Sequence, residues 1–326
     1  MEPTEFFMPY AAEGLNPLEL EAEAGMWDWL EKFELVPTEL TRRRMVRTRP
    51  ARMYALWCPA AGVHELTLLS QYTAWAFVVD DQFDIEIPDP QRCLDAITAL
   101  NAVFDSDRQP SGVLAVSFAD LWRRLSEGRS PEWRESVRAE IRDWLWTYYT
   151  ESVGRLSGNL PDLETYRAHR RDGVALFVFL DISERAEGVD LSPAARYLPA
   201  MRSLREAAVE HMGLFNDVLS VASDEASGYL YNSVLLAEYH FGHSRTEALT
   251  LVNNMLTECI ERCETALERL SSELHDAGVS DRDRIDTLAT ARNYTVYVRA
   301  NFDYHYQAAR YTSAPIEALE HGLPLT

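Results

Sequence analysis

The stretch His64–Asp84, HELTLLSQYTAWAFVVDDQFD, indicates the class of fold that the chain adopts. Its apolar side chains recur every three or four residues, at Leu68, Tyr72, Trp75, Ala76 and Val79. This spacing places them on one face of an α-helix, whereas a half-buried strand would alternate apolar and polar residues. The stretch therefore predicts a long helix that packs against other elements.

The same helical period returns along the rest of the chain. Arg134–Glu151, Ala248–Leu270 and Arg284–Tyr311 each carry one apolar stripe. Gly173–Ile182, GVALFVFLDI, is apolar on more than one face, as is typical of a helix inside a bundle. Proline and glycine mark short breaks, and no low-complexity linker divides the chain. We therefore predict an all-α fold in a single domain over residues 1–326.

The charge balance limits the classes of partner. The 326 residues include 31 basic and 52 acidic side chains, which give a formal net charge of −21. This negative field disfavours a nucleic-acid backbone or an anionic membrane surface as the main partner. An anionic substrate remains compatible with it if a divalent metal or a few local arginines supply positive charge.

The sequence shows no sign of a membrane or secreted location. No stretch reaches the roughly 20 apolar residues that a membrane span needs. Met1–Phe7 carries two acids and no basic residue, unlike the start of a secretory signal. Four cysteines are too few for a disulfide framework in a chain of this length. We expect a cytoplasmic protein with reduced thiols.

Three carboxylates follow directly on the apolar run of the first helix, at Asp80, Asp81 and Asp84. Asp80 and Asp84 are four residues apart, so they share one helix face. Carboxylates crowded at the end of a buried helix repel one another unless a cation compensates them. Oxygen ligands alone favour a hard ion such as Mg²⁺ over Zn²⁺. The alternative is a solvated helix end.

A second polar cluster lies in HMGLFNDVLSVASDE, residues 211–225. Asn216, Ser220 and Asp224 are spaced four residues apart, so three oxygen-bearing side chains line one face of an apolar helix. An amide, a hydroxyl and a carboxylate in this arrangement can chelate one Mg²⁺ together with phosphate oxygens of a substrate. The alternative is a polar stripe facing solvent, with Asp217 and Glu225 serving solubility.

These clusters resemble known motifs. DDQFD at 80–84 resembles the DDxxD motif of class I terpene synthases, and NDVLSVASD at 216–224 resembles their second metal motif, NDxxSxxxE. FFMPYAAEGLNP at 6–17 resembles the N-terminal strip of the bacterial members, and GYLYNSVLL at 228–236 resembles the segment after the second motif. NYTVYVRANFDYHYQAARY at 293–311 resembles their C-terminal box, which ends in an Arg-Tyr pair.

The resemblance implies a helical bundle around a central apolar pocket. It also implies a carbon–oxygen lyase that ionises a prenyl diphosphate and cyclises the resulting carbocation. In the family, the two acidic motifs hold a trinuclear Mg²⁺ cluster that grips the diphosphate. By that resemblance the metal ligands would be Asp80, helped by Asp84, together with Asn216, Ser220 and Asp224. Asp81 would lie behind these ligands and pair with an arginine.

Basic residues that would contact the diphosphate follow from the same resemblance. Arg310 and Tyr311 match the family's Arg-Tyr pair, which hydrogen-bonds the diphosphate. YRAHRRDG at 166–173 resembles the segment with the diphosphate-sensing arginine. The spacing to the second motif favours Arg170 over Arg171 in that role. A guanidinium suits phosphate oxygens because it can donate two parallel hydrogen bonds.

Aromatic residues are the candidates for stabilising the carbocation, because an aromatic face attracts a cation without being a nucleophile. Phe77 lies one helical turn before the first motif. Tyr297, Tyr304 and Tyr311 are spaced seven residues apart, which predicts one shared helix face. A plain aromatic core stripe would give the same pattern.

The second motif departs from the family pattern at its end, where Asp224 replaces the usual Glu and Glu225 follows. Asp224 shares a face with Asn216 and Ser220, whereas Glu225 is turned about 100° away on an α-helix. We therefore expect Asp224 to be the ligand, with Glu225 as the alternative.

Two rival functions are compatible with an acidic helical protein. A prenyl-chain elongating synthase has a similar fold but carries two DDxxD motifs, and only one is present here. A non-catalytic helical interaction protein would not explain both polar clusters. The sequence leaves farnesyl and geranylgeranyl diphosphate equally possible as substrate, and it leaves open a monomer or a homodimer.

Overall fold

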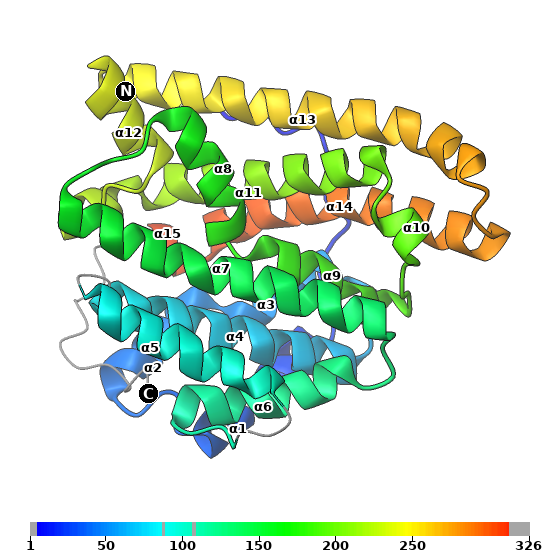
Figure 1. The fold of residues 1–326 in the computed structure, drawn as a ribbon, viewed down its shortest axis with the longest axis horizontal. Helices are drawn as coiled ribbons and strands as arrows, with labels where there is room; N and C mark the ends of the chain where they lie inside the picture. The colour runs from blue at the N-terminus through cyan, green and yellow to red at the C-terminus, as the bar shows by residue number, and fades with distance from the viewer. Residues whose placement is uncertain (1–4, 87–88, 106–108, 313–326) are drawn as a thin grey trace. The chain divides into compact units, whose positions relative to one another are not determined.

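The computed structural model describes residues 5–86, 89–105 and 109–312, with the side chains of residues 84–86 left undescribed. These residues form helices joined by loops and contain no strand, so the predicted all-α fold class is confirmed (Figure 1). None of the helices in this described part is long and apolar enough to cross a membrane.

The chain groups into two compact units. The N-terminal unit comprises Gly14–Asn159 together with Gln307–Thr326, and the C-terminal unit comprises Met1–Glu13 together with Leu160–Tyr306. The first acidic motif lies in the N-terminal unit and the second motif lies in the C-terminal unit. The single domain over residues 1–326 stays a prediction.

In the N-terminal unit, the helix with the first motif is central. The helices of this unit are α1 (Glu19–Lys32), α2 (Glu39–Thr48), α3 (Pro50–Trp57), α4 (Val63–Glu86), α5 (Pro90–Asn101), the 3₁₀ turn η1 (Ala102–Phe104), α6 (Val113–Ser126), α7 (Pro131–Ser157) and α15 (Ala309–Thr312). Helix α4 contacts α1, α3, α5 and α6 (Figure 1). Helix α4 is therefore buried on several faces, and this packing fixes the position of the polar residues near its C-terminal end.

Aromatic contacts fix the position of α4 in its unit. The ring of Trp75 stacks on Phe118 of α6 with centroids 4.5 Å apart. One turn before the end of α4, Phe83 stacks on Tyr148 of α7 at 4.2 Å. Both residues of each pair are buried, so these contacts add to the stabilisation from burial of apolar area. They place the first motif next to the middle of α7.

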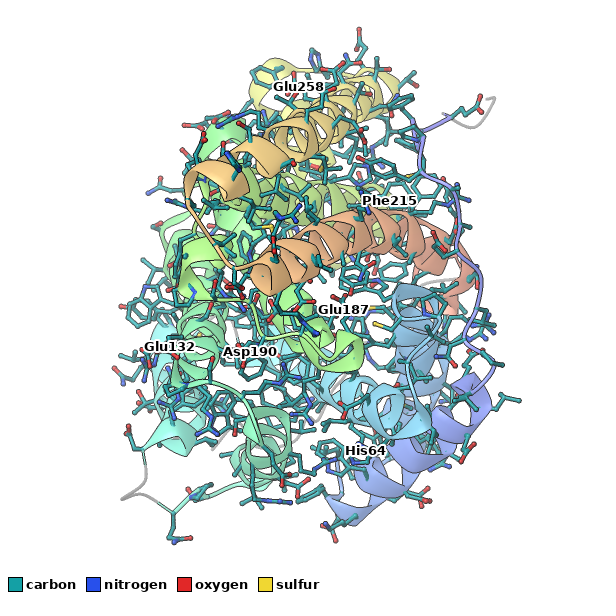
Figure 2. All side chains as sticks on the ribbon, turned by 90° about the vertical axis from the view of Figure 1, so that its right-hand side faces the viewer. His64, Glu132, Glu187, Asp190, Phe215 and Glu258 are labelled. Carbon is teal, nitrogen blue, oxygen red and sulfur yellow. The ribbon has the colours of Figure 1, made fainter. Side chains whose placement is uncertain are left out.

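In the C-terminal unit, the helix with the second motif has the corresponding role. The helices of this unit are α8 (Leu163–Gly173), α9 (Leu176–Glu187), α10 (Pro193–Arg196), α11 (Pro199–Ser227), α12 (Ser233–Phe241), α13 (Arg245–Asp276) and α14 (Asp281–Gln307). Helix α13 runs along α11, which also contacts α8, α9 and α12 (Figure 1). Phe215 of α11, labelled in Figure 2, stacks on Phe302 of α14 with ring centroids 4.4 Å apart.

Most of the apolar run Gly173–Ile182 is buried, with Gly173, Val174 and Phe177 only partly so, but the prediction of one continuous helix is wrong. Helix α8 ends at Gly173 and α9 begins at Leu176. Between them Ala175 has φ +63°, in the left-handed region that is costly for a residue with a side chain. The hydrogen bond from the Val174 N–H to the Arg170 carbonyl closes the end of α8. Periodicity could not reveal this break, because both sides of it are equally apolar.

A buried ion network anchors α9. Asp181 and Glu184 of α9 are fully buried, and both accept hydrogen bonds from Arg196 of α10 at 2.6 and 2.8 Å. Arg205 of α11 adds a second bond to Asp181. Burial, aided by the charge of Asp181, raises the pKa of Glu184 against the opposing effect of Arg196. Removal of one partner would leave an unpaired buried charge, which is strongly destabilising.

His211 is a buried histidine in the middle of α11. It is 1% exposed and stacks on Phe215 with centroids 6.5 Å apart. Within the described residues, neither of its ring nitrogens has a hydrogen-bond partner. Burial lowers the pKa of His211 from 6.5 to about 3, because the apolar surroundings cannot solvate an imidazolium.

We predict that His211 makes the protein acid-sensitive. Because the pKa is lower in the folded than in the unfolded state, its contribution to stability is fully present above the unfolded pKa and is lost as pH falls below it. Between pH 7 and pH 5 the wild-type protein should lose about 2 kcal/mol through this group. Urea unfolding of His211→Leu should show a correspondingly weaker pH dependence. The exposed His64 provides the control, and a similar change in His64→Leu would contradict the assignment.

Candidate active site

At the end of α4, Asp81 is clamped by two arginines. The Arg44 guanidinium of α2 donates from Nη2 to Oδ1 at 2.7 Å and from Nε to Oδ2 at 3.2 Å. Arg310 of α15 donates from Nη2 to Oδ1 at 3.0 Å. The carboxylate is 8% exposed. Burial by itself would raise the pKa of Asp81, but Arg310 and Arg44 together hold it below its usual value. Asp81 is thus ionised, and both of its carboxylate oxygens accept hydrogen bonds from arginine.

Asp80 lies in a different environment. Its side chain is 42% exposed, and its nearest oxygen lies 3.6 Å from the Arg310 Nη2. The Tyr148 hydroxyl donates to its Oδ1 at 2.9 Å. Of these two adjacent carboxylates, Asp80 is the one that can present oxygen to a ligand from solvent. Asp84 belongs to α4, but its side chain lies outside the described part of the structure.

The predicted cation-stabilising ring of Phe77 already faces a cation. The Arg310 guanidinium carbon lies 5.1 Å from the centre of the Phe77 ring. This distance is within the range of a cation–π contact. In the structure, therefore, the aromatic face one turn before the first motif is covered by the arginine of the C-terminal Arg-Tyr pair.

The prediction that Tyr311 shares a helix face with Tyr297 and Tyr304 is wrong. Helix α14 ends at Gln307, and Tyr311 lies in the separate helix α15. Contacts from α2 and α3 hold the chain where the two helices meet. Arg47 donates to the Ala309 carbonyl at 3.3 Å and Arg52 donates to the Gln307 side chain at 3.5 Å. Such long-range contacts cannot be read from periodicity.

The second motif is assembled on α11 as its spacing predicts. Ser220 Oγ donates to Oδ2 of Asp224 at 2.7 Å, so these side chains share a face. Asn232, the N-cap of α12, donates from Nδ2 to the same oxygen at 2.8 Å. Burial raises the pKa of Asp224 to about 6, although the bonds from Ser220 and Asn232 lower it. Both hydrogen-bond donors to the Asp224 carboxylate are neutral, so they do not cancel its negative charge, and a bound cation would be attracted to it.

The alternative acid, Glu225, points elsewhere. Its side chain is 59% exposed and pairs with Arg245 of α13 at 3.1 Å. Asp224 bonds to Ser220, whereas Glu225 makes its ion pair with α13. The difference follows from the helix itself, because successive residues are turned about 100° apart.

Arg170 reaches the second motif and Arg171 does not. Arg170 of α8 donates from Nη2 to Asn216 Oδ1 at 2.8 Å, and its Nε lies 2.9 Å from Asp217 Oδ1. Arg171 instead donates to Glu210 at 3.0 Å. The geometry therefore favours Arg170, the arginine that the spacing also favours, for a role at the second motif.

Asp217 is buried, so the solubilising role considered for it is wrong. It is 1% exposed and accepts hydrogen bonds from the Tyr166 hydroxyl at 2.8 Å and the Ser233 N–H at 2.9 Å. Burial raises the pKa of Asp217, with Arg170 opposing the shift. Asp217 connects α8, α11 and α12, and so it sets the position of Arg170 against the motif.

Two of the predicted aromatic residues, Tyr297 and Tyr304, lie on α14 and are each 1% exposed. The Tyr297 hydroxyl donates to Glu187, the residue labelled at the end of α9 in Figure 2. Burial raises the pKa of Glu187 even though Tyr297 lowers it. The structure thus gives Tyr297 a structural hydrogen bond at the α9–α14 contact.

Sequence reasoning missed two residues that contribute to these clusters, Arg44 and His305, and for a third, Asn232, it found the segment but not the role. Arg44 sits in the basic run TRRRMVR at 41–47, where nothing distinguishes it from its neighbours. Asn232 lies in the matched segment GYLYN, but its capping role depends on how the chain turns into α12. His305 is 89 residues away from Asn216 in the sequence, yet its Nε2 lies 3.0 Å from the Asn216 Nδ2.

The donor atoms of the second motif suit a hard cation. They are an amide oxygen, a hydroxyl and a carboxylate, without sulfur, which is the ligand chemistry of Mg²⁺. In the described part of the chain, no group of three or more His, Cys, Asp or Glu side chains is placed to hold a metal alone. Mg²⁺ commonly keeps water and substrate phosphate among its ligands, so it needs only a few protein oxygens. The residues present therefore fit the ion that the motifs imply.

Comparison with known proteins agrees with these features. A model of terpene synthase family 2, C-terminal metal binding, matches residues 71–262. The (2Z,6E)-hedycaryol synthase of Kitasatospora setae is 28% identical over 94% of this chain and 91% of its own length. A (−)-β-caryophyllene synthase of Saccharothrix espanaensis, named as cyclising (2E,6E)-farnesyl diphosphate, is 25% identical over 95% of this chain and 89% of its own.

A solved structure is similar as well. Hedycaryol synthase in complex with HEPES superposes with a TM-score of 0.84 at 28% identity, covering 93% of this chain and 98% of that one. The similarity thus extends well beyond the two motifs.

We predict that the clamp on Asp81 stabilises the fold. Arg44→Ala removes two charge-assisted hydrogen bonds from a buried carboxylate and should lower the free energy of unfolding by about 2–3 kcal/mol. Arg42→Ala, in the same helix, breaks an exposed pair with Glu31 and should cost less than about 1 kcal/mol. Urea unfolding measures both. Equal losses in the two variants would show that Arg44 has no special role.

Proposed function

The chain belongs to terpene synthase family 2, and on that premise we propose that it cyclises farnesyl diphosphate to a sesquiterpene. The class I terpene cyclase predicted from the sequence is confirmed by the family match and by relatives that span nearly the whole chain. The observation that supports the C15 substrate is the β-caryophyllene synthase relative, whose name specifies farnesyl diphosphate and which matches 95% of this chain.

We propose Mg²⁺ as the metal and three ions as its number. Asp80 is the proposed ligand from the first motif, with Asp84, and Asn216, Ser220 and Asp224 are the ligands from the second. When bound, the metal would supply positive charge to the departing diphosphate. The exposure of Asp80 and the neutral donors around Asp224 support these assignments.

The diphosphate also needs hydrogen-bond donors from the protein. We assign this role to Arg170 and to the pair Arg310 and Tyr311. In the structure these arginines are held by carboxylates, Arg310 by Asp81 and Arg170 by Asp217. A diphosphate carries more charge than one carboxylate, so it competes for the guanidinium groups through stronger charge-assisted bonds.

Movement of Arg310 would also change the environment of Phe77. While Arg310 covers the Phe77 ring, that face is already engaged with a cation. Once Arg310 turns toward a diphosphate, the ring becomes available to a carbocation, which it can stabilise without reacting. Tyr304 and Tyr297 are proposed to contribute aromatic faces, with the Tyr297 hydroxyl kept on Glu187. Exclusion of water protects the cation from quenching.

We predict that purified protein releases inorganic diphosphate from farnesyl diphosphate in the presence of Mg²⁺ and forms a cyclic C15 product. Because metal charge assists ionisation, EDTA should abolish release and added Mg²⁺ should restore it. Diphosphate assay and gas chromatography–mass spectrometry measure the two outcomes. Turnover of geranylgeranyl diphosphate alone would contradict the C15 proposal, and chain elongation with isopentenyl diphosphate would support the prenyltransferase alternative.

We predict that the last metal ligand is Asp224. Asp224→Asn keeps the shape but weakens an anionic ligand, so kcat/KM should fall by about 100-fold or more. The matched change Glu225→Gln alters an exposed residue paired with Arg245 and should leave turnover close to wild type. Steady-state kinetics at saturating Mg²⁺ compares the variants. The reverse ranking would show that the motif is displaced by one residue.

A further inference from the structure

The side-chain amide of Asn216 is held at both ends. Its Oδ1 accepts a hydrogen bond from Arg170 Nη2 at 2.8 Å. Its Nδ2 lies 3.0 Å from Nε2 of His305 on α14. The other ring nitrogen of His305, Nδ1, lies 2.7 Å from the backbone carbonyl of Asn301. A continuous chain of hydrogen bonds therefore runs from Asn301 through His305 and Asn216 to Arg170.

The two ends of this chain fix the direction of every bond in it. A backbone carbonyl can only accept, so His305 Nδ1 must carry the proton that it donates to Asn301. A guanidinium can only donate, so Arg170 must face the oxygen of the Asn216 amide rather than its NH₂ group. The NH₂ group then faces His305, whose Nε2 must accept. Only the neutral imidazole with its proton on Nδ1 satisfies all three contacts.

The opposite orientation of the amide is excluded by the same reasoning. Turning the amide over would place its NH₂ group against the Arg170 guanidinium, which sets donor against donor. It would also place Oδ1 against the lone pair of His305 Nε2, which sets acceptor against acceptor. The orientation of an amide is ordinarily inferred from its hydrogen bonds, and here contacts on opposite sides agree.

We propose that His305 is a positioning residue that presents the Asn216 oxygen, rather than its nitrogen, for metal ligation; this inference rests on the proposed function. An amide oxygen can ligate Mg²⁺ and an amide nitrogen cannot. Oδ1 has two lone pairs, so ligation does not require that Arg170 leave. If Arg170 does turn to a diphosphate, His305 still holds the NH₂ group, and the oxygen stays on the metal-binding face.

The surroundings of His305 suit this role because they hold its ring rigidly. His305 is 3% exposed, and its ring meets Phe215 edge-on at 5.8 Å and Tyr304 edge-on at 5.4 Å. A side chain locked by packing can keep its hydrogen-bond partner in one orientation before the ligand arrives. Partners of this kind, one step removed from the metal, typically change metal affinity by about 10–100-fold when they are lost.

The first part of the test measures the hydrogen-bond direction directly. Nitrogen-15 NMR of histidine-labelled wild-type protein distinguishes the two neutral tautomers and the imidazolium, and loss of a signal in His305→Gln assigns it among the 8 histidines. We expect His305 to be neutral with its proton on Nδ1. Protonation at Nε2 would overturn the proposed orientation, whatever reaction the protein catalyses.

The second part measures metal binding rather than turnover. Mn²⁺ serves as the spectroscopic probe, titrated by electron paramagnetic resonance in the presence of inorganic diphosphate. His305→Leu removes the acceptor and should weaken Mn²⁺ binding by about 10–100-fold. His305→Gln can place a carbonyl oxygen near the lost Nε2 and should recover much of the affinity. His211→Leu is the matched control, because it removes another buried histidine of the same unit and should leave binding unchanged.

The outcomes separate this inference from the proposed function. Equal Mn²⁺ affinity in wild type and a folded His305→Leu would overturn the positioning role while leaving the metal site intact. An equal loss in His305→Leu and His211→Leu would also overturn it, because general loosening of the unit would then be the cause. Failure of wild-type protein to bind Mn²⁺ with diphosphate would overturn the proposed metal site instead, and the tautomer would still decide the hydrogen-bond chain.

Discussion

The requirement that every buried carboxylate be matched by a donor organises this protein. It carries 52 acidic residues, and several of those it buries are held by arginine. Asp81 is held by Arg44 and Arg310, and Glu210 is held by three arginines, Arg167, Arg171 and Arg262. A buried charge without such partners would lower the free energy of unfolding by several kcal/mol, a large part of the net stability of a typical domain.

The two motifs proposed to bind metal differ from these structural pairs in the groups that their acids contact. Asp80 is partly exposed and receives a tyrosine hydroxyl, while its arginine stays 3.6 Å away. Asp224 is held by a serine and an asparagine, which are neutral. The neighbouring acids, Asp81 and Asp217, receive the guanidinium groups. In each motif, therefore, one acid forms a buried ion pair with arginine. The other acid accepts hydrogen bonds from neutral groups, which leaves its charge available to a cation.

The two arginines proposed to bind the diphosphate form ion pairs with these buried acids, Asp81 and Asp217. Arg310 contacts Asp81 and covers Phe77, and Arg170 contacts Asp217 and Asn216. This arrangement keeps positive charge close to each motif without leaving it unpaired in a buried place. Under the proposed function, an arginine that turns to a diphosphate would release the groups it had been covering, so substrate binding would change both clusters locally.

The sequence by itself determined the all-α class and both acidic motifs, because these depend on local helical spacing. Residues four apart share a face of an α-helix wherever that helix is placed. The same rule separated Asp224 from Glu225, which the structure shows in different contacts. The resemblance to class I terpene synthases could be recognised for the same reason, since its motifs are short and contiguous.

Only the tertiary structure decided which distant partners these residues have. Nothing in TRRRMVR distinguishes the arginine that reaches Asp81 across 37 residues from its neighbours, because the packing of α2 against the rest of its unit makes that choice. The break at Ala175 and the end of α14 at Gln307 likewise depend on contacts outside the local window. The contact between His305 and Asn216 spans 89 residues, and it exists because α11 and α14 pack together through Phe215 and Phe302. Periodicity fixes which face a side chain occupies, whereas packing alone fixes what lies opposite that face.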